Sequence, residues 1–411
     1  MANNEADIKR SLSWRKMILP LVLGLAAATY LFVNSLNQER YFKVENGTGT
    51  HIWIDSPDEK GKFNGVVDSE LDKDFQLKEG GDFVFAKVKH KMAEIEWTTS
   101  VFFFLFLAFL TVLVRDFGYM YRIRVLTDKF FSWKESFQVI MLWELSSALT
   151  PSVVGGSGVA VFIMNREGLS LGKSTATMFV TALMDELFYI IMVPLVFLVA
   201  GSTGLWPDSI FSMEGAKIKW IFWGGYLFLC TLTVIIVLSL FFFPQGFKKV
   251  LIRIFSLKFL RRWIRQVVQL GNDIIISSGE LKGKPFSFWL KAAGSTLFSW
   301  TARFFTLNFV IMAFMCTWNN MNCLDQLYVY GRQLIMWIYV LIGITPGSSG
   351  IAEIALAAFF EDTVITAQYV AIVAIIWRAL TYFPYLFIGS AVLPRWLSRT
   401  SLKQAKLKAE A

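Results

Sequence analysis

Several long apolar segments limit what this chain can fold into more than any other feature does. Three of them are Met17 to Val33, Ser174 to Ala200 and Trp220 to Phe243. Each is long enough to cross a hydrocarbon core about 30 Å thick. Of all residues, 55% are hydrophobic and only 17% are charged, and the mean hydropathy is +0.51. So little polar surface cannot solvate a globule of 411 residues. The sequence therefore predicts an all-α polytopic membrane protein.

The formal net charge of +9 follows from membrane orientation and does not indicate nucleic-acid binding. The basic residues stand in short runs between apolar segments, which is typical of cytoplasmic loops. From Lys248 to Arg265 they alternate with apolar residues, which predicts a helix lying on an anionic cytoplasmic leaflet. Basic residues before Met17 and after Leu393 predict that both termini are cytoplasmic.

The apolar stretch from Phe137 to Met164 is interrupted in its middle by Pro151, Gly155 and Gly156. Proline cannot donate the next helical hydrogen bond, and glycine takes backbone conformations that other residues avoid, so one helix ends and another begins there. Inside a membrane such a break is tolerated only where protein or a water-filled cavity surrounds it. Basic residues on both flanks predict a re-entrant hairpin that enters from the cytoplasm.

A second break of the same kind lies between Gly343 and Tyr382, at Pro346, Gly347 and Gly350. An acid, Glu353, follows where the apolar run restarts. Half-helix N-termini at such breaks offer N–H groups and a partial positive charge to an anion, such as a phosphate or a carboxylate. The flanks lack basic residues, so this hairpin is predicted to enter from outside. A loop between two ordinary helices, with Gly350 as N-cap and Glu353 closing a local hydrogen bond, is the alternative.

The order helix, hairpin, helix occurs in both Thr98 to Ala200 and Phe286 to Leu393. The first set is predicted to begin outside and the second inside, which is an inverted-topology repeat. The whole chain then has about six transmembrane helices plus two oppositely oriented re-entrant hairpins. Within the first set, the span Thr98 to Val114 is predicted to end on cytoplasmic basic residues that include Arg115 and Arg122.

The chain divides into four parts by composition. They are an N-terminal cytoplasmic segment with the first transmembrane helix (1–36), an external insertion (37–97), a membrane domain (98–393) and a basic cytoplasmic tail (394–411). The insertion has strand-like pieces at His51 to Ile54 and Asp82 to Val88. It contains no recognisable chemistry, so a packing role or the docking of a partner protein is expected of it.

Seven charged residues fall within the predicted membrane segments. Each costs at least about 2.5 to 3.5 kcal/mol at a lipid-facing helix centre, so they must pair or line a wet cavity. An arginine suits a phosphate because it binds it bidentately. Three roles stay open for the carboxylates: holding an arginine in place, taking protons that drive transport, or binding a cationic headgroup. The seven residues are Glu144, Asp185, Glu186, Arg303, Arg332, Glu353 and Arg378.

Histidine and cysteine offer no metal or cofactor site in this sequence. The two histidines, His51 and His90, both lie in the external insertion, and Cys230, Cys316 and Cys323 lack metal-ligand spacing. We therefore expect no metal, no cofactor and no catalytic residue.

Two groups of residues resemble the membrane domain of lysylphosphatidylglycerol synthases and of their stand-alone flippase-like relatives. The more specific group is Pro346-Gly347-x-x-Gly350-x-x-Glu353 followed by Arg378-x-x-x-Tyr382. The looser group is Pro151-x-x-x-Gly155-Gly156 with Arg166-x-Gly168 and, further on, Asp185-Glu186, where the family usually shows an acid next to an arginine. The resemblance covers roughly Thr98 to Leu393.

This resemblance implies a lipid-translocating domain in the bacterial cytoplasmic (inner) membrane. The family moves an aminoacylated phospholipid between leaflets or works beside polyprenyl-linked glycosyl transfer. Because the chain ends soon after Leu393, we expect a stand-alone form that lacks the aminoacyl-transferase domain and is not an enzyme.

The leading hypothesis is a flippase-like transporter of an anionic or aminoacylated phospholipid, or of a polyprenyl-linked lipid. An intramembrane enzyme acting on a lipid-linked phosphate or sugar is one alternative, and a non-transporting membrane scaffold is another. The predicted substrate-binding residues are Pro151, Gly155, Gly156, Asp185, Glu186, Arg303, Pro346, Gly347, Gly350, Glu353, Arg378 and Tyr382.

Overall fold

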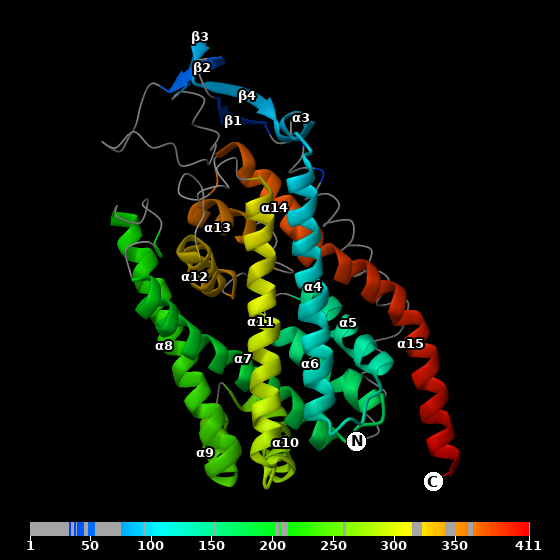
Figure 1. Cartoon of the computed structure of the whole chain (residues 1–411). Helices are drawn as coiled ribbons and strands as arrows, with labels where there is room; N and C mark the ends of the chain where they lie inside the picture. The colour runs from blue at the N-terminus through cyan, green and yellow to red at the C-terminus, as the bar shows by residue number, and fades with distance from the viewer. Residues whose placement is uncertain are drawn as a thin grey trace. The chain divides into compact units, whose positions relative to one another are not determined.

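The structure is a computed structural model, whose helices and strands are labelled in Figure 1. Its chain forms two compact units. It describes residues 33, 37, 39–44, 48–53, 75–93, 96–150, 153–201, 205–206, 213–257, 260–314, 323–341, 348, 351–360, 365 and 367–410. The first unit comprises residues 1–110, 200–219 and 305–383, and the second comprises 111–199, 220–304 and 384–411. The first predicted membrane helix, Met17 to Val33, lies outside the described residues apart from Val33.

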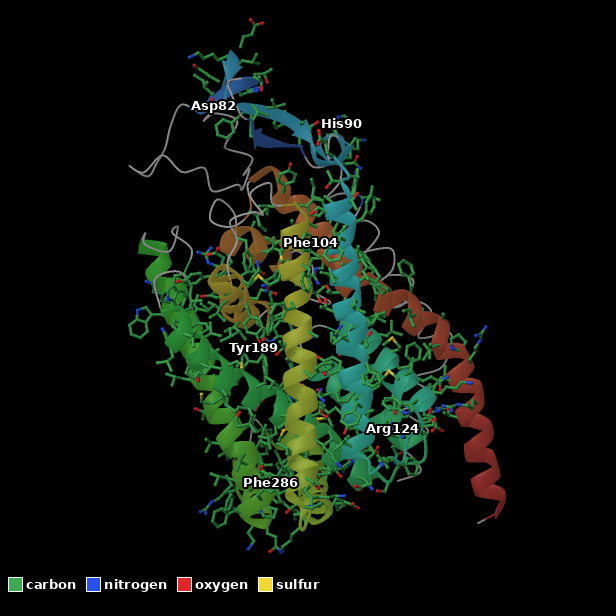
Figure 2. The ribbon with its side chains drawn as sticks, in the orientation of Figure 1. Asp82, His90, Phe104, Arg124, Tyr189 and Phe286 are labelled. Atoms are coloured by element: carbon green, nitrogen blue, oxygen red, sulfur yellow. The ribbon has the colours of Figure 1, made fainter. Side chains whose placement is uncertain are left out.

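The first unit begins with a four-stranded antiparallel sheet that Figure 2 marks with Asp82. Its strands, in the spatial order β1-β4-β2-β3, are β1 (Glu39–Lys43), β2 (Gly49–Trp53), β3 (Phe75–Gly81) and β4 (Phe83–Lys87). Strands β2 and β4 confirm the two strand-like pieces predicted in the insertion. The short helix α3 (Val88–Ala93), which carries the labelled His90, follows the sheet.

The helices of the first unit form a second, apolar part of it. They are α12 (Cys323–Leu341), α13 (Ile351–Phe360) and α14 (Ala367–Thr381), with the first residues of α4 and the last of α11. The Arg332 guanidinium donates a 3.0 Å hydrogen bond to the carbonyl of Phe359, near the far end of α13. Arg332 stands well before the end of α12 at Leu341, and Phe359 lies well after the start of α13 at Ile351, so this bond shows that α13 folds back along α12.

The second unit is entirely helical in its described part. It contains most of α4 (Thr99–Leu126), α5 (Trp133–Leu149), α6 (Val153–Arg166), α7 (Leu171–Ala200), α8 (Met213–Val237) with its π-helical end η4 (Leu238–Phe242), α9 (Pro244–Phe255), the 3-10 turn η5 (Arg261–Trp263), α10 (Ile264–Leu281), α11 (Phe286–Phe314) and α15 (Phe383–Glu410).

Five helical segments of the described chain are long and apolar enough to cross a membrane. They are Thr99–Leu126, Leu171–Ala200, Lys219–Phe242, Phe286–Phe314 and Ile372–Leu397. Large apolar side chains stand exposed along them, including Phe102 and Phe106 on α4 and Leu227 and Phe228 on α8. Such surfaces are stable against acyl chains and costly in water. The chain is thus an all-α polytopic membrane protein with a small sheet, as predicted.

The prediction that the first of these spans ends at Val114 is wrong. Helix α4 continues to Leu126, and both Arg115 and Arg122 lie inside it at 2% and 6% exposure. Basic residues at the end of an apolar run usually mark a cytoplasmic loop. Here carboxylates on neighbouring helices offset the cost of burying them.

Helices α5 and α6 fold back on one another within the second unit. Arg399 of α15 forms ion pairs with Glu135, in the first turn of α5, and with Glu167, just after α6. The two outer ends of the pair therefore meet at one arginine. Helix α5 ends with Thr150 in an extended conformation, as expected of the break before Pro151, although Pro151 itself lies outside the described residues. The re-entrant placement of either hairpin remains a prediction.

Candidate functional site

Helix α4 presents a polar face inside a membrane-spanning segment. Arg115, Tyr119 and Arg122 are four and three residues apart, a spacing that places them on one side of the helix. We call these three residues the arginine face. All three belong to the second unit and are buried, with Tyr119 at 6% exposure. A buried charge in a membrane helix is a functional-site candidate because its desolvation has to be offset.

Arg115 lies at one end of this face among acceptors from three helices. Its guanidinium forms an ion pair with Glu144 of α5 and donates a 2.6 Å hydrogen bond to the hydroxyl oxygen of Tyr385. The Tyr385 hydroxyl donates in turn to Asp116 at 2.9 Å. Asp116 is also 3.8 Å from the guanidinium. Arg115 is thus held by a charged partner and a tyrosine at the same time.

Arg122 lies at the other end of the arginine face and has its own partners. It forms an ion pair with Asp185 of α7, its second nitrogen lying 3.4 Å from the other carboxylate oxygen. It also donates to the hydroxyl of Thr296 on α11 at 3.1 Å. Asp185 accepts a further hydrogen bond of 2.7 Å from the indole N–H of Trp300. This carboxylate therefore orients Arg122 and is itself oriented by Trp300.

The aromatic ring of Tyr119 lies between the two arginines. The central guanidinium carbon of Arg115 is 5.0 Å from the ring centroid, and that of Arg122 is 4.9 Å from it. Both distances are within the range of a cation–π contact. The two ion pairs therefore form one connected polar cluster along α4.

The structure separates Asp185 from its neighbour Glu186, although both were predicted to bind substrate. Successive residues point about 100° apart around a helix, so the two carboxylates leave α7 in different directions. Asp185 faces Arg122, whereas Glu186 accepts a 2.8 Å hydrogen bond from Thr233. Only Asp185 joins the cluster around the arginine face.

Arg303, another predicted binding residue, lies on α11 next to this cluster. Its guanidinium carbon is 5.0 Å from the ring centroid of Trp300, the residue that donates to Asp185. Trp300 also stacks on Phe188 at 5.7 Å. Arg303 and Phe188 thus both contact the tryptophan that orients Asp185.

The glycines of the first predicted break allow α5 and α6 to pack closely. A Cβ atom added to Gly156 would lie 2.2 Å from the hydroxyl oxygen of Ser147 and 3.2 Å from its Cα. Gly155 lies in the same helix, one residue earlier. Here glycine is needed for the approach of two backbones, and nothing described at Gly156 indicates a ligand.

In the first unit Arg378 contacts Ser348, which lies within the second predicted break. Its guanidinium donates a 3.0 Å hydrogen bond to the carbonyl of Ser348, which also accepts the backbone N–H of Ala352 in the first turn of α13. The rings of Trp377 and Tyr382 lie 5.4 and 5.2 Å from its guanidinium carbon. Arg378 thus fixes the start of α13.

Four predicted residues of the second break cannot be placed. Pro346, Gly347 and Gly350 lie outside the described residues, and so does the side chain of Glu353. The predicted pairing of Glu353 with Arg378 therefore remains a prediction.

Comparison with known proteins identifies the family. The family model of the lysylphosphatidylglycerol synthase TM region matches residues 83–389. The chain belongs to this family. A UPF0104 membrane protein from Archaeoglobus fulgidus is 24% identical over 282 residues, which are 63% of this chain and 75% of that protein. No solved structure matches the chain.

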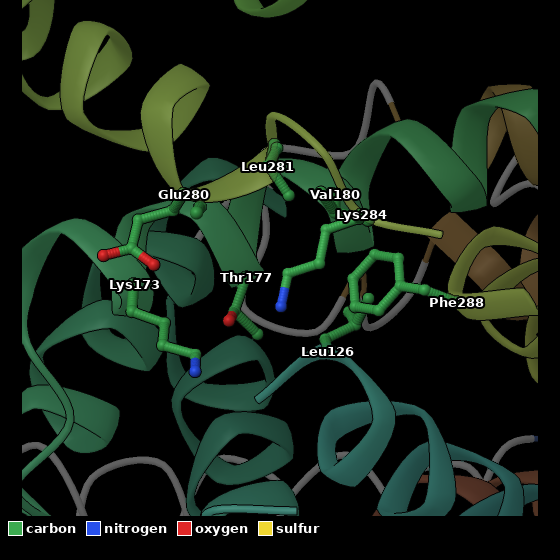
Figure 3. Close-up of a pocket in the computed structure, with 9 residues that line it drawn as sticks. Leu126, Lys173, Thr177, Val180, Glu280, Leu281, Lys284 and Phe288 are labelled. Carbon is green, nitrogen blue, oxygen red and sulfur yellow. The ribbon is translucent and has the colours of Figure 1, made fainter. Parts of the chain in front are cut away.

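Within this member of the lysylphosphatidylglycerol synthase TM family, a small pocket lies where α7, α10 and α11 approach one another (Figure 3). Lys173, Thr177, Glu280 and Lys284 contribute its polar lining. The volume of this cavity is about 10 Å³, which is room for about one water molecule. The pocket is therefore too small for a lipid headgroup.

Next to this pocket, Asp128 joins three elements at the end of α4. It accepts hydrogen bonds from Lys173 at 2.7 Å and from Lys284 at 2.7 and 2.8 Å. Burial raises the pKa of the Asp128 carboxyl, but the two ammonium groups lower it by more, so this pKa lies below its ordinary value. The cluster links α4, α7 and the start of α11.

No group of three or more His, Cys, Asp or Glu side chains suited to a metal ion occurs among the residues that the structure describes.

The sequence predictions missed five residues of the polar cluster, which are Arg115, Asp116, Tyr119, Arg122 and Tyr385. One signal could have found them, since Arg115, Tyr119 and Arg122 follow the apolar run of α4 at helical spacing and without a helix breaker.

Proposed function

We propose that this protein moves an anionic phospholipid or a polyprenyl-linked lipid between membrane leaflets, and that the arginine face of α4 binds the phosphate of its headgroup. The observation that carries the proposal is the pair of buried arginines, Arg115 and Arg122, on one side of a membrane-spanning helix. Guanidinium groups bind phosphate through two parallel hydrogen bonds. Membership of the lysylphosphatidylglycerol synthase TM family supports a lipid as the substrate.

The carboxylates keep the empty site neutral in this proposal. Without Glu144 and Asp185 the two guanidinium groups would be buried charges with a large desolvation cost. The arginine side chains are 3% and 8% exposed, whereas the side chains of Glu144 and Asp185 are 24% and 28% exposed. A headgroup can therefore approach each pair from the side of the carboxylate. Its phosphate then replaces the carboxylate as the partner of the arginine.

The proposal places the protein in a bacterial inner membrane, with both termini in the cytoplasm. The distribution of basic residues between the apolar segments supports this orientation. In this view the protein transports its lipid without changing it chemically.

A transport assay in vesicles tests the proposal. Purified protein is reconstituted into vesicles of phosphatidylcholine and phosphatidylglycerol that contain fluorescent NBD-phosphatidylglycerol, and dithionite bleaches the outer leaflet. Wild-type protein is expected to expose inner-leaflet lipid to dithionite faster than protein-free vesicles do, without or with an imposed proton gradient.

A neutral variant and a charge control complete the experiment. The variant combining Arg115→Gln, Glu144→Gln, Arg122→Gln and Asp185→Asn is expected to lose transport. Lys248→Gln removes one exposed charge of the same unit, whose ammonium donates to Asn272, and is expected to transport like wild type. Wild-type protein that bleaches no faster than protein-free vesicles under either condition would refute the proposed function.

A further inference from the structure

We infer that the arginine face contains two phosphate-binding stations in series, bridged by the ring of Tyr119. This inference rests on the proposed function and specifies the route of the headgroup along α4. The first station is Arg115 with Glu144, and the second is Arg122 with Asp185. Each station pairs one guanidinium with an exchangeable carboxylate from another helix, and the first station also has Asp116 3.8 Å from its guanidinium.

The two stations are at different depths along one membrane-spanning helix. Arg115 and Arg122 are seven residues apart in α4, which is about 10 Å along the helix axis, or about a third of a hydrocarbon core of roughly 30 Å. Both guanidinium carbons reach toward the Tyr119 ring, but each faces a carboxylate from a different helix, so a phosphate that displaces one carboxylate meets one arginine at a time. A headgroup that crosses the membrane along this face has to move from one station to the next.

The partners of the two stations also come from different helices. Arg115 contacts Glu144 of α5 and Tyr385 of α15. Arg122 contacts Asp185 of α7 and Thr296 of α11. Because the hydrogen-bonding partners differ, each station can be emptied or neutralised while the other keeps its geometry.

Tyr119 is the element that the stations share. Its ring centroid lies 5.0 Å from the guanidinium carbon of Arg115 and 4.9 Å from that of Arg122. When a phosphate takes an arginine from its carboxylate, the ring still stabilises the guanidinium, so the arginine can move without becoming an isolated charge. These contacts need the π face of the ring and not the hydroxyl group. A phenylalanine at position 119 is therefore expected to stabilise both guanidinium groups in the same way.

The exchange at each station is a change of ionic partner, with no bond made or broken. At the second station Asp185 keeps a donor when Arg122 turns to phosphate, because the Trp300 indole N–H remains 2.7 Å away. A carboxylate that keeps one hydrogen bond costs less to release than one left bare. The second station is therefore expected to exchange its partner more readily than the first.

Lipid retention tests whether there are two stations. The probe is phosphatidylglycerol, counted by mass spectrometry after purification from vesicles of phosphatidylcholine and phosphatidylglycerol. Arg115→Gln with Glu144→Gln removes the ion pair of the first station and leaves Asp116 with the hydrogen bond from Tyr385, and Arg122→Gln with Asp185→Asn removes the ion pair of the second. Each paired variant is expected to retain phosphatidylglycerol, and only the combined variant is expected to retain none above its phosphatidylcholine background. Loss of all phosphatidylglycerol in either paired variant would mean a single site and would overturn the inference.

The transport rate tests the bridge. Tyr119→Leu is expected to slow NBD-phosphatidylglycerol movement about thirtyfold, the factor that corresponds to losing a desolvated cation–π contact. Tyr119→Phe keeps the ring and is expected to move lipid much faster than Tyr119→Leu, both variants retain phosphatidylglycerol, and Lys248→Gln is the control that keeps the wild-type rate. Equal rates for Tyr119→Leu and wild type would overturn the bridge.

The two experiments separate the inference from the proposed function. If wild-type protein moves no lipid, the proposed function fails, and retention still reports whether two phosphate sites exist. If wild-type protein moves lipid but the paired variants show one site, only the inference fails.

Discussion

The ion pair between Arg115 and Glu144 gives the sharpest test of how the second unit is held together. Replacing Arg115 alone with glutamine leaves Glu144 without its guanidinium, and removes the donor to Tyr385. Breaking a buried pair in this way costs about 3 to 5 kcal/mol. Because the Glu144 side chain is 24% exposed, the lower end of this range is expected, about 3 kcal/mol.

The double variant should lose less stability than the two single variants lose in sum. With both Arg115→Gln and Glu144→Gln, Glu144 no longer carries a charge that has lost its partner, and Asp116 keeps the hydrogen bond from Tyr385, so the free energy of unfolding should fall no further than in either single variant. The resulting coupling free energy is about 2 to 3 kcal/mol. Equilibrium unfolding in mixed detergent micelles measures it, and the 15 tryptophans of the chain supply the fluorescence signal.

An exposed pair serves as the control for this cycle. Lys87 and Glu39 lie 3.6 Å apart on the sheet with side chains 40% and 51% exposed, so their coupling should be below about 1 kcal/mol. If the two single changes at Arg115 and Glu144 simply add up in the double variant, the pair carries no interaction energy and the assignment of the arginine face is wrong.

Three further predictions concern other parts of the molecule. Gly156→Ala should destabilise the α5–α6 pair by about 1 to 3 kcal/mol, because the added Cβ would lie 2.2 Å from a serine hydroxyl oxygen of α5; Gly158→Ala, which meets nothing within 4 Å, is the control in the same unfolding assay. The pKa of Asp128 is lowered in the folded state, so its contribution to stability is present above the unfolded pKa and disappears as the pH falls through the folded pKa. The unfolding midpoints of wild type and Asp128→Asn should therefore converge below about pH 4. A difference between the two midpoints that stays constant with pH would contradict the assignment. Arg378→Gln removes the hydrogen bond to the Ser348 carbonyl, so amide hydrogen exchange in the first turn of α13 should accelerate about tenfold, and unchanged exchange there would exclude Arg378 as its anchor.

The membrane spans were predictable because they depend on local composition. The predicted spans from Thr98, Ser174, Trp220 and Phe286 begin within three residues of the membrane-spanning segments that start at Thr99, Leu171, Lys219 and Phe286. The last of these coincides with the start of α11. The break before Pro151 was predictable for the same reason, since proline stops a helix wherever it occurs.

The partners of the buried charges were not predictable from sequence. Asp185 and Glu186 are adjacent and chemically alike, yet only Asp185 faces an arginine, because the rotation of α7 about its axis decides which residue points toward α4. The hydrogen bond from Arg378 to the carbonyl of Ser348 likewise depends on tertiary packing, and the predicted binding of a headgroup by Arg378 stays a prediction.

The residues alone indicate a helical membrane protein with two proline and glycine breaks, and the motifs of the chain resemble the family to which it belongs. That Arg115 and Arg122 lie inside helix α4 and not in a loop beyond it is seen in the folded chain and not in the pattern of residues. The reason is physical: a basic residue after an apolar run is stable in a watery loop, and it is equally stable in a buried helix once a carboxylate from another helix meets it. The sequence contains both residues of such a pair, but packing alone brings Glu144 and Asp185 to them.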